Sequence, residues 1–235
     1  MTENNFINEL NEIGICIDEE KINQLNLYQA LLVEWNKVIN LTGITEKDEV
    51  FLKHFYDSLT LNKAIDLKSI ESLCDVGTGA GFPGLVIKIL FPHINVVLID
   101  ALNKRINFLN DVINKLGLKN IVAVHSRSED YAKDNREKFD VVTARAVSNL
   151  PVLMELCVPL VKEGKYFIPL KANIDEEILL ADNAEKLLYI IKDEIIKFKL
   201  PIENSNRTII RYKKIKSTNK KYPRKFADIK KKPLW

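Results

Sequence analysis

Hydrophobic positions in the first 70 residues follow a helical spacing. Between Ile22 and Ile39 the apolar side chains recur at intervals of three, four and seven residues, which predicts a helix with one buried face. Asp18 precedes this helix and suits the positive end of its dipole, and Asn40-Leu41-Thr42-Gly43 ends it. A further helix is expected across 47–64. The chain therefore begins with a helical region.

From residue 71 the pattern changes to short apolar runs that alternate with helix-length segments. This alternation predicts βαβ units and a parallel, doubly wound sheet. Two last strands, near 189–198 and 207–212, are joined by too few residues for a crossover helix, so we expect them to pair antiparallel. The other expected strands are 72–76, 94–99, 121–124, 139–143 and 166–170, and the expected helices are 84–91, 104–116, 150–161 and 175–188.

Five parallel strands followed by an antiparallel terminal hairpin is the layout typical of class I S-adenosylmethionine-dependent methyltransferases, whose sheet is Rossmann-like. We therefore predict an α/β fold with three parts. These are an N-terminal helical extension at 1–70, a cofactor-binding domain at 71–213 and a C-terminal tail at 214–235. From Ser217 onward the tail is polar and basic, and we expect it to be loosely ordered.

Composition narrows the class of protein. Of 235 residues, 46% are hydrophobic and 29% are charged, which is typical of a globular chain and excludes a collagen-like or disordered one. Cys16, Cys74 and Cys157 are far apart, so neither a disulfide framework nor a zinc site is indicated, and a reducing cytoplasm is the expected location. The chain has no apolar run of membrane-spanning length and no start typical of a signal peptide. We expect a monomer that uses no metal and binds no membrane.

Charge is distributed unevenly, although the net charge is only +3. Residues 207–235 hold 12 Lys and Arg and a single acid, Asp228, whereas the rest of the chain holds 23 basic and 31 acidic residues. A basic segment on an acidic body indicates a polyanionic partner such as nucleic acid, and a solvated charged end is the alternative. The residues expected to contact RNA are Arg211, Lys220, Lys221, Arg224 and Lys225.

Residues 75–84, with the sequence DVGTGAGFPG, form the sharpest motif. They connect an expected strand to an expected helix, which is where open α/β sheets bind nucleotides. Glycine permits positive φ and close approach of a ligand, so Gly77, Gly79 and Gly81 are expected to border a cofactor. The match to the dinucleotide pattern G-x-G-x-x-G is out of register, and Asp75 suits a ligand with an ammonium group, as S-adenosylmethionine has. A tight turn without a ligand is the alternative.

Two further strand ends carry polar residues. Asp100 ends the second expected strand and can accept hydrogen bonds from ribose hydroxyls, while a helix N-cap is the alternative. Ser128 and Glu129 follow the third strand, where an adenine would lie. For these two residues an ordinary helix start explains the sequence equally well.

The fourth expected strand ends at Arg145 and bears on the reaction. The D/N-P-P-Y/F motif of enzymes that methylate exocyclic amines of bases is absent there, and Cys157 lies in an apolar helical run rather than in a nucleophile site. Guanine N7 needs neither that motif nor a cysteine nucleophile, because its lone pair carries no proton. Placement of the substrates and electrostatics around the sulfonium would suffice for methyl transfer to it. No acid or base is assigned, and Arg145 and Lys171 are the candidates for positioning cations. A surface salt bridge is the alternative for Arg145.

The chain resembles the glucose-inhibited division protein B family, also called bacterial rRNA small subunit methyltransferase G. The resemblance spans nearly the whole chain, and the glycine motif with its Phe82-Pro83 is quite specific. The other matching motifs are W-N-x-x-x-N-L-T from Trp35, H-x-x-D-S-L from His54, K-R-x-x-F-L from Lys104, S-R-x-E from Ser126, R-A at Arg145-Ala146, L-K at Leu170-Lys171 and Y-P-R-K with K-x-P-L from Tyr222.

The resemblance implies transfer of a methyl group from S-adenosylmethionine to N7 of guanine 527 in the 530 loop of 16S rRNA, within RNA or the small subunit. The product would be S-adenosylhomocysteine. The sequence departs from the family at 226–229, where Phe-Ala-Asp-Ile replaces a stretch that usually contains Gly and Pro. The resemblance implies cofactor roles for Gly77, Phe82, Ser128, Glu129 and Arg145.

Other roles stay open from the sequence. Asn36, Asn40, His54 and Asp57 either line the substrate cleft or act as caps and buried hydrogen-bond partners. Tyr212 and Tyr222 are candidates for stacking on unpaired bases. Three other function classes are an NAD(P)-dependent oxidoreductase, a catalytically silent RNA-binding factor and a small-molecule methyltransferase.

Overall fold

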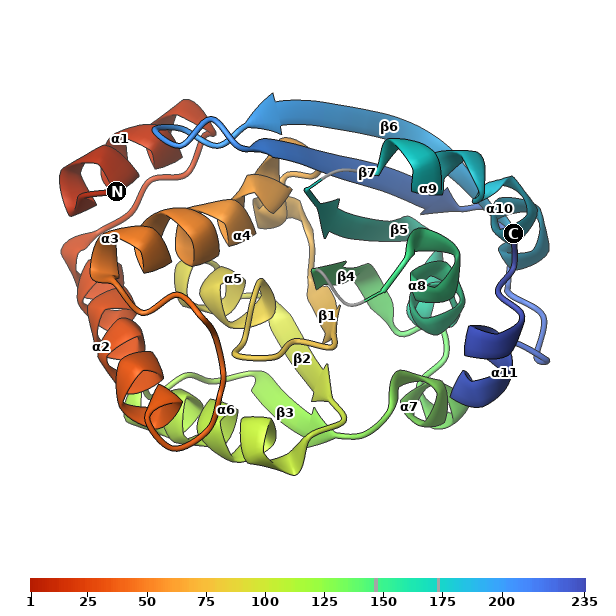
Figure 1. The fold of residues 1–235 in the computed structure, drawn as a ribbon, viewed down its shortest axis with the longest axis horizontal. Helices are drawn as coiled ribbons and strands as arrows, with labels where there is room; N and C mark the ends of the chain where they lie inside the picture. Colours follow the sequence, from red (N-terminus) through yellow and green to blue (C-terminus); the bar gives the residue numbers. More distant parts are fainter. Residues whose placement is uncertain (146–147, 173) are drawn as a thin grey trace.

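A seven-stranded sheet of order β3-β2-β1-β4-β5-β7-β6 crosses the molecule (Figure 1). The computed structural model describes residues 1–145, 148–172 and 174–235, so Ala146 of the Arg145-Ala146 pair lies outside the described residues. The first five strands are parallel, and β7 runs antiparallel to both β5 and β6. The strands are β1 Ser72–Val76, β2 Asn95–Asp100, β3 Ile121–His125, β4 Phe139–Arg145, β5 Val161–Lys171, β6 Ile190–Lys199 and β7 Asn206–Lys214.

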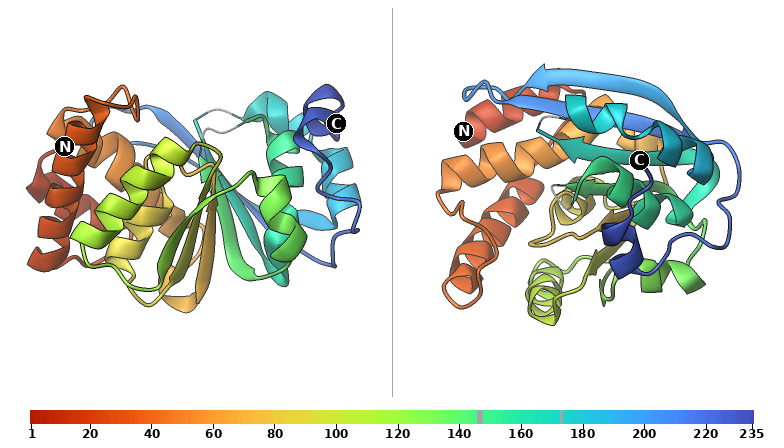
Figure 2. Two further views of the ribbon diagram at one scale, coloured as in Figure 1. Left: turned by 90° about the horizontal axis from the view of Figure 1, so that it is seen from below. Right: turned by 45° about the vertical axis from the view of Figure 1, so that its right-hand side comes forward.

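Helices cover both faces of this sheet, as Figure 2 shows edge-on. One face carries the N-terminal helices with α5 and α6, and the other carries α7 to α11 (Figures 1 and 2). This is the doubly wound arrangement predicted from the alternation of apolar runs. The helices are α1 Glu3–Glu12, α2 Glu19–Asn36, α3 Lys47–Val50, α4 Asp57–Leu59, α5 Gly84–Leu90, α6 Asn103–Lys115, α7 Ser128–Asp134, α8 Leu150–Cys157, α9 Asp175–Leu179, α10 Asp182–Leu188 and α11 Phe226–Lys231.

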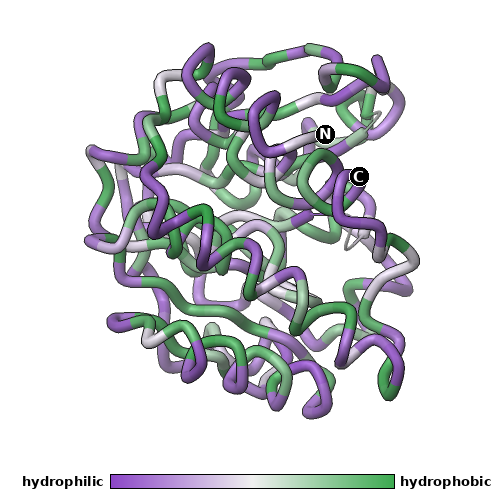
Figure 3. Tube along the Cα trace, turned by 90° about the vertical axis from the view of Figure 1, so that its left-hand side faces the viewer, coloured by the Kyte–Doolittle hydropathy of each residue, from purple (hydrophilic) through white to green (hydrophobic). Residues whose placement is uncertain are grey.

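Alternate residues of the central strands pack into two separate hydrophobic cores, one on each face of the sheet. In β1, Leu73 packs with the N-terminal side and Cys74 with the opposite side, and Val141 and Val142 of β4 divide in the same way. Successive strand side chains point to opposite faces, so continuous apolar runs are required where both faces are covered. In Figure 3 the helices on the N-terminal side alternate between hydrophilic and hydrophobic stretches, as expected of helices with one buried face.

The N-terminal region is helical as predicted, with two differences. Helix α2 begins after Asp18, whose side chain accepts a hydrogen bond from Lys21 N, but ends at Asn36, before Ile39. The segment expected as one helix over 47–64 changes type along its length and includes a π-helix at Phe51–Tyr56. Nearly every side chain of this π-helix is buried, so no single α-helical face could have held them.

Two expected helices on the other face are shorter than predicted. The helix expected over 150–161 ends at Cys157, and a 3-10 turn over Val158–Leu160 leads directly into β5 at Val161. Pro159 lies in that turn and would break an α-helix, because it lacks a backbone N–H and its ring clashes with the preceding turn. The helix expected over 175–188 is divided into α9 and α10.

The C-terminal tail folds against the body, so the expectation of a loosely ordered tail is wrong. Tyr222, Ile229 and Leu234 are buried in the core on the α8 side. Arg224 binds the fully buried Glu155 through both carboxylate oxygens, at 2.8 and 2.6 Å. A buried carboxylate needs such a partner, and this requirement fixes the tail.

Both tyrosines proposed to stack on RNA bases are core residues instead. Tyr212 is fully buried and its ring stacks on Phe167 at 6.0 Å, and Tyr222 is 4% exposed. Both rings are buried inside the fold, although the polar residues around them in the sequence suggested that they would be exposed. Within the described residues, no helix has the length and apolar character needed to cross a membrane.

Candidate functional site

A cavity of about 460 Å³ opens at the carboxyl ends of β1 and β2. The glycine loop forms its floor, the end of β2 one wall, and the N-terminal region the opposite wall. Parallel strands all end at this edge, which is where α/β sheets bind their ligands. The lining residues are Leu41, Thr42, His54, Gly77, Thr78, Gly79, Ala80, Phe82, Asp100, Ala101, Leu102, Arg105 and Arg145.

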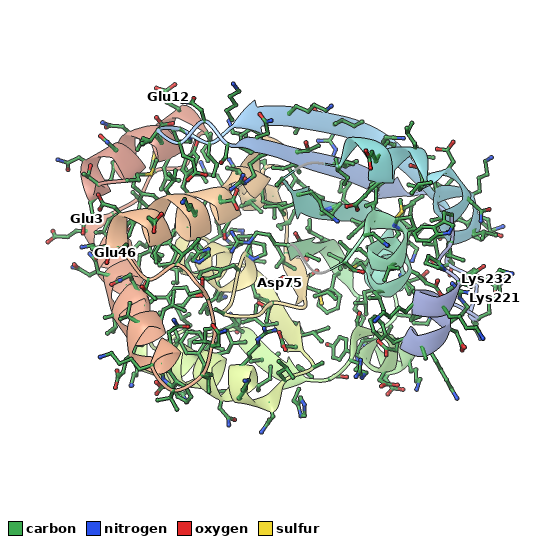
Figure 4. The ribbon with its side chains drawn as sticks, in the orientation of Figure 1. Glu3, Glu12, Glu46, Asp75, Lys221 and Lys232 are labelled. Carbon is green, nitrogen blue, oxygen red and sulfur yellow. The ribbon has the colours of Figure 1, made fainter. Side chains whose placement is uncertain are left out.

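Asp75 holds the glycine loop in shape from below. It is fully buried near the centre of the molecule (Figure 4), and its Oδ2 accepts hydrogen bonds from Thr78 Oγ1 at 2.7 Å and Gly84 N at 2.8 Å. Burial raises the pKa of this carboxyl to about 6, against the opposing effect of these two hydrogen bonds. Its Oδ1 is buried without a partner among the described residues.

The three glycines predicted to border a cofactor have positive φ, but they serve different purposes. Gly77 and Gly79 line the cavity, and a Cβ on Gly79 would project into open space. A Cβ on Gly81 would instead lie 2.6 Å from Tyr28 Oη and 2.9 Å from Leu85 Cβ. Gly81 therefore allows the loop to pack against α2, and we replace its expected cofactor contact with this packing role.

Asp100 joins the end of β2 to the glycine loop. Its Oδ2 accepts from Gly79 N at 2.9 Å and from Arg105 Nη1 at 3.1 Å, while Oδ1 accepts from Leu102 N at 2.9 Å. Asp100 closes the turn before α6 but is not its N-cap, which is Leu102, and it also borders the cavity. Its carboxylate is largely engaged within the protein, so a ribose contact stays a prediction.

Ser128 and Glu129 line a second cavity of about 160 Å³ next to the first. The two cavities share Gly77, Asp100 and Ala101 in their walls. Ser128 Oγ donates to Leu156 O at 2.8 Å, so its hydroxyl is used to fix α7 against α8. The cofactor residues predicted from the sequence thus line these two adjacent cavities, with the exception of Gly81.

A third cavity, of about 470 Å³, lies on the other side of His54 and Arg145. These two side chains line both this cavity and the glycine-loop cavity, so they form the partition between them. Its walls hold four cations against one anion, and the residues that supply these charges are Lys53, Arg145, Lys171, Arg207 and Asp57.

Arg145 is held rigidly in this partition. Its Nη1 donates to Asp57 Oδ2 at 2.9 Å and to Lys53 O at 3.0 Å, and its Nη2 lies 3.2 Å from His54 Nδ1. Its guanidinium also lies 5.0 Å from the centre of the Phe82 ring. The ion pair expected as the alternative role is present, but it is mostly buried and lies at the cavity wall rather than on the surface.

His54 is uncharged at neutral pH. Burial and the neighbouring Arg145 charge lower its pKa to about 3. Nδ1 of His54 lies 3.2 Å from Arg145 Nη2 and 3.1 Å from Lys53 O. Since Lys53 O already accepts from Arg145 Nη1, we assign Nδ1 as the acceptor from Arg145 Nη2, and Nε2 then donates to Thr42 Oγ1 at 2.8 Å. The ring stacks on Phe82 at 4.4 Å.

Of the N-terminal residues left open by the sequence, His54 and Asp57 line cavities and Asn36 does not. Asn36 accepts from the backbone N–H groups of Leu41 and Thr42 and caps the turn after α2. Asp57 also pairs with Arg207 Nε at 2.7 Å, although the two are 150 residues apart in sequence. Arg207 was missed by the sequence analysis, and only its place in the basic C-terminal stretch drew attention to that region.

The predicted RNA contacts and Lys171 divide into paired and exposed cations. Lys171 binds Glu177 at 2.8 Å, and Arg211 binds Asp193 at 2.6 Å and the carbonyl of Ala64. Arg224 is committed to Glu155. Lys220, Lys221 and Lys225 are exposed, and Figure 4 places Lys221 at the edge of the molecule. Within the described parts of the chain, no group of three or more His, Cys, Asp or Glu side chains is arranged to hold a metal.

Comparison with known proteins identifies close relatives over the whole chain. A model of the rRNA small subunit methyltransferase G family matches residues 21–209. The ribosomal RNA small subunit methyltransferase G proteins of Lachnoclostridium phytofermentans and Bacillus subtilis are both 49% identical over 232 residues. These alignments cover 97% of this chain and 96% and 97% of the respective relatives.

Solved structures of more distant proteins share the fold. An S-adenosylmethionine-dependent methyltransferase from Aquifex aeolicus aligns with a TM-score of 0.52 at 18% identity, covering 76% of this chain and 96% of the other. A variant of MtNAS in complex with S-adenosylmethionine aligns with a TM-score of 0.55 at 17% identity, covering 83% and 76%. The predicted class I methyltransferase fold is confirmed.

Proposed function

Since the chain belongs to the rRNA small subunit methyltransferase G family, we propose that it methylates N7 of guanine 527 in the 530 loop of 16S rRNA, with S-adenosylmethionine as methyl donor. The observation that carries the proposal is the shared wall of His54 and Arg145 between two cavities. A methyl group passes in line from donor to acceptor, so the proposal requires the two substrates to touch beside this shared wall, with the reacting atoms about 3–3.5 Å apart and no side chain between them.

The groove along β1 and β2 fits the methyl donor. Gly79 leaves open space that a Cβ would fill, and the two cavities with Gly77, Asp100 and Ala101 in common extend from the glycine loop to Glu129. In this assignment Gly77, Gly79 and Phe82 hold the middle of the donor, Asp100 its ribose, and Ser128 with Glu129 its adenine. When bound, S-adenosylmethionine supplies a methyl group activated by its sulfonium charge.

The cationic cavity fits a nucleotide of RNA. Its lining holds the cations Lys53, Arg145, Lys171 and Arg207 and the anion Asp57, and two of these cations are paired with carboxylates beside the cavity, Lys53 with Glu49 and Glu203 and Lys171 with Glu177. Three of the five N–H donors of Arg145 are used by Asp57, Lys53 and His54, which leaves its Nε–H and one Nη2–H for a phosphate or for guanine O6. Arginine is suited to both because its donors are planar and fixed.

The partition offers no general base, and guanine N7 requires none. Arg145 acts only as a hydrogen-bond donor, and the Nδ1 lone pair of His54 is directed at it. An acceptor whose lone pair is already free needs only alignment with the donor, which the ion pairs of Asp57 make rigid. Targets that must lose a proton before attack fit this partition less well.

RNA outside the cavity would contact the exposed lysines. Lys220, Lys221 and Lys225 lie on the surface near α11, whereas Arg211 and Arg224 are engaged within the protein. We therefore assign phosphate contacts to the three lysines and structural roles to the two arginines. Such contacts make binding fall steeply with salt.

A methyl-transfer assay on two substrates tests the proposal. Labelled S-adenosylmethionine is supplied with 16S rRNA or with small subunits that lack the modification, and borohydride–aniline cleavage then reports N7-methylguanine. Cleavage in the 530 loop is the expected result. The Gly79→Val variant is the matched control, because its Cβ would block the donor groove and no label should transfer.

The methyl-transfer assay, together with binding titrations of S-adenosylhomocysteine, rRNA and NADH, separates the alternatives. Label at another guanine would keep the chemistry and overturn the site. No label, from a protein that binds S-adenosylhomocysteine and rRNA, would favour a silent RNA-binding factor. Binding of NADH without binding of S-adenosylhomocysteine would favour an oxidoreductase.

A further inference from the structure

We propose that the C-terminal segment forms part of the cofactor site, with Phe226 of α11 as the residue that covers the adenine. Phe226 lines the small cavity together with Gly77, Asp100, Ser128 and Glu129, although it lies 97 to 149 residues after them in the chain. The inference rests on the donor assignment made above, in which this cavity holds the adenine end.

The geometry around Phe226 suits a flat ring. Its side chain is half-buried, with one part packed on the core beside α8 and another facing the cavity. The guanidinium of Arg127 lies over the Phe226 ring, 5.6 Å from its centre, and both residues line the cavity. An aromatic face and a guanidinium plane are the two groups on which nucleobases stack.

The segment is anchored well enough to act as a fixed wall. Glu155 is fully buried, and its carboxylate accepts from Arg224 N, Nε and Nη2 at 2.9, 2.8 and 2.6 Å. Ile229, one turn after Phe226, is also fully buried. These anchors lie on both sides of Phe226 and set its position over the cavity. The departure from the family pattern at 226–229 is thus a change in the wall of the cofactor site.

One consequence concerns deletion of the tail. Removing residues 217–235 would take away exposed lysines, but it would also remove Phe226 and leave the Glu155 charge buried without its partner. Loss of activity in such a deletion would therefore not show that the tail binds RNA. Single substitutions are needed to separate the two effects.

Calorimetric titration with S-adenosylhomocysteine tests the inference without any turnover. Phe226→Ala should weaken binding by about 5- to 150-fold, the range found for removing one aromatic face from a stacked base. Phe226→Tyr keeps the ring and should bind as the wild type does. Lys230→Ala, an exposed residue of the same helix, is the matched control and should have no effect.

Two further measurements distinguish a contact with adenine from damage to the fold. Binding of 5′-methylthioadenosine, which has the adenine and ribose but not the amino-acid end, should weaken by the same factor in Phe226→Ala. Limited proteolysis should show the tail still docked in Phe226→Ala and released in Glu155→Gln, which should also bind the ligand more weakly.

The possible failures are distinct. If the wild type does not bind S-adenosylhomocysteine, the proposed function fails. If the wild type binds it and Phe226→Ala changes affinity by less than about twofold, only the role of Phe226 is overturned. Unchanged affinity in Glu155→Gln with a released tail would likewise overturn it.

Discussion

Gly79 and Gly81 stand two residues apart in one motif, and the structure assigns them opposite sensitivities. An alanine at Gly79 takes a left-handed φ of +62°, and its Cβ meets no atom within 4 Å. An alanine at Gly81 takes a φ of +97° and places its Cβ 2.6 Å from Tyr28 Oη, 2.9 Å from Leu85 Cβ and 3.1 Å from Leu109 Cδ2. The first change should damage the ligand site, and the second should damage the fold.

The expected magnitudes follow from backbone strain and crowding. Gly79→Ala costs about 1 kcal/mol, because an L-residue in the left-handed region loses roughly 1–2 kcal/mol. Gly81→Ala adds overpacking of about 1–3 kcal/mol to a similar strain, for a total of roughly 2–5 kcal/mol. For a chain of this size these losses correspond to Tm decreases of about 2–4 °C and about 5–15 °C.

Urea unfolding and calorimetric binding of S-adenosylhomocysteine measure the two effects separately. Gly79→Ala should lose at least tenfold in affinity, since its Cβ occupies the donor groove, whereas Gly81→Ala should lose mainly stability. The Tyr28→Phe background removes the nearest obstructing atom, so Gly81→Ala should cost less stability there. A stable Gly81→Ala, a Gly79→Ala with wild-type affinity, or strictly additive losses in the double variant would refute the reasoning.

Three other changes test the partition and the surface lysines. Arg145→Lys keeps the charge but loses the planar set of hydrogen-bond donors, so methyl transfer should fall at least tenfold while Tm changes by a few degrees. Equal rates in the variant and the wild type would mean that Arg145 has a purely structural role. Because His54 has a pKa lowered from 6.5 to about 3, its contribution to stability is present above pH 6.5 and is lost as the pH falls toward 3, by up to about 1.4 kcal/mol per pH unit. Asp75, with its pKa raised to about 6, opposes this trend between pH 4 and 6. The test is therefore the difference in acid unfolding between the wild type and His54→Gln. This difference should vanish if His54 were exposed. Lys221→Ala should reduce the slope of log K for rRNA against log salt by about 0.7–0.9 if one phosphate contact is lost. Arg211→Ala should leave this slope unchanged, because the Arg211 guanidinium binds Asp193. Equal effects of the two variants would count against the division into paired and exposed cations.

Much of the fold could be predicted from the sequence because the deciding signals are local. Period-two and period-3.6 patterns report which faces are buried, and a short connection after the sixth strand excludes a parallel crossover. The strands, the antiparallel end and the glycine turn were therefore located correctly. The errors fell where α8 ends at Cys157 before the turn that contains Pro159, where the helix expected over 175–188 is divided, where a helix became a π-helix near His54, and at the tail.

The sequence by itself determined the fold class, the position of the cofactor loop and the excess of basic residues at the C-terminus. Only the tertiary structure decided what each basic residue does. Arg207 and Arg145 meet on Asp57, and Arg224 meets Glu155, through contacts between residues 69 to 150 positions apart. The local pattern contains no information on such pairings, because the partner of a charge is set by which distant segments the fold brings together. The same reason separates Gly79 from Gly81 and brings Phe226 to the cofactor groove.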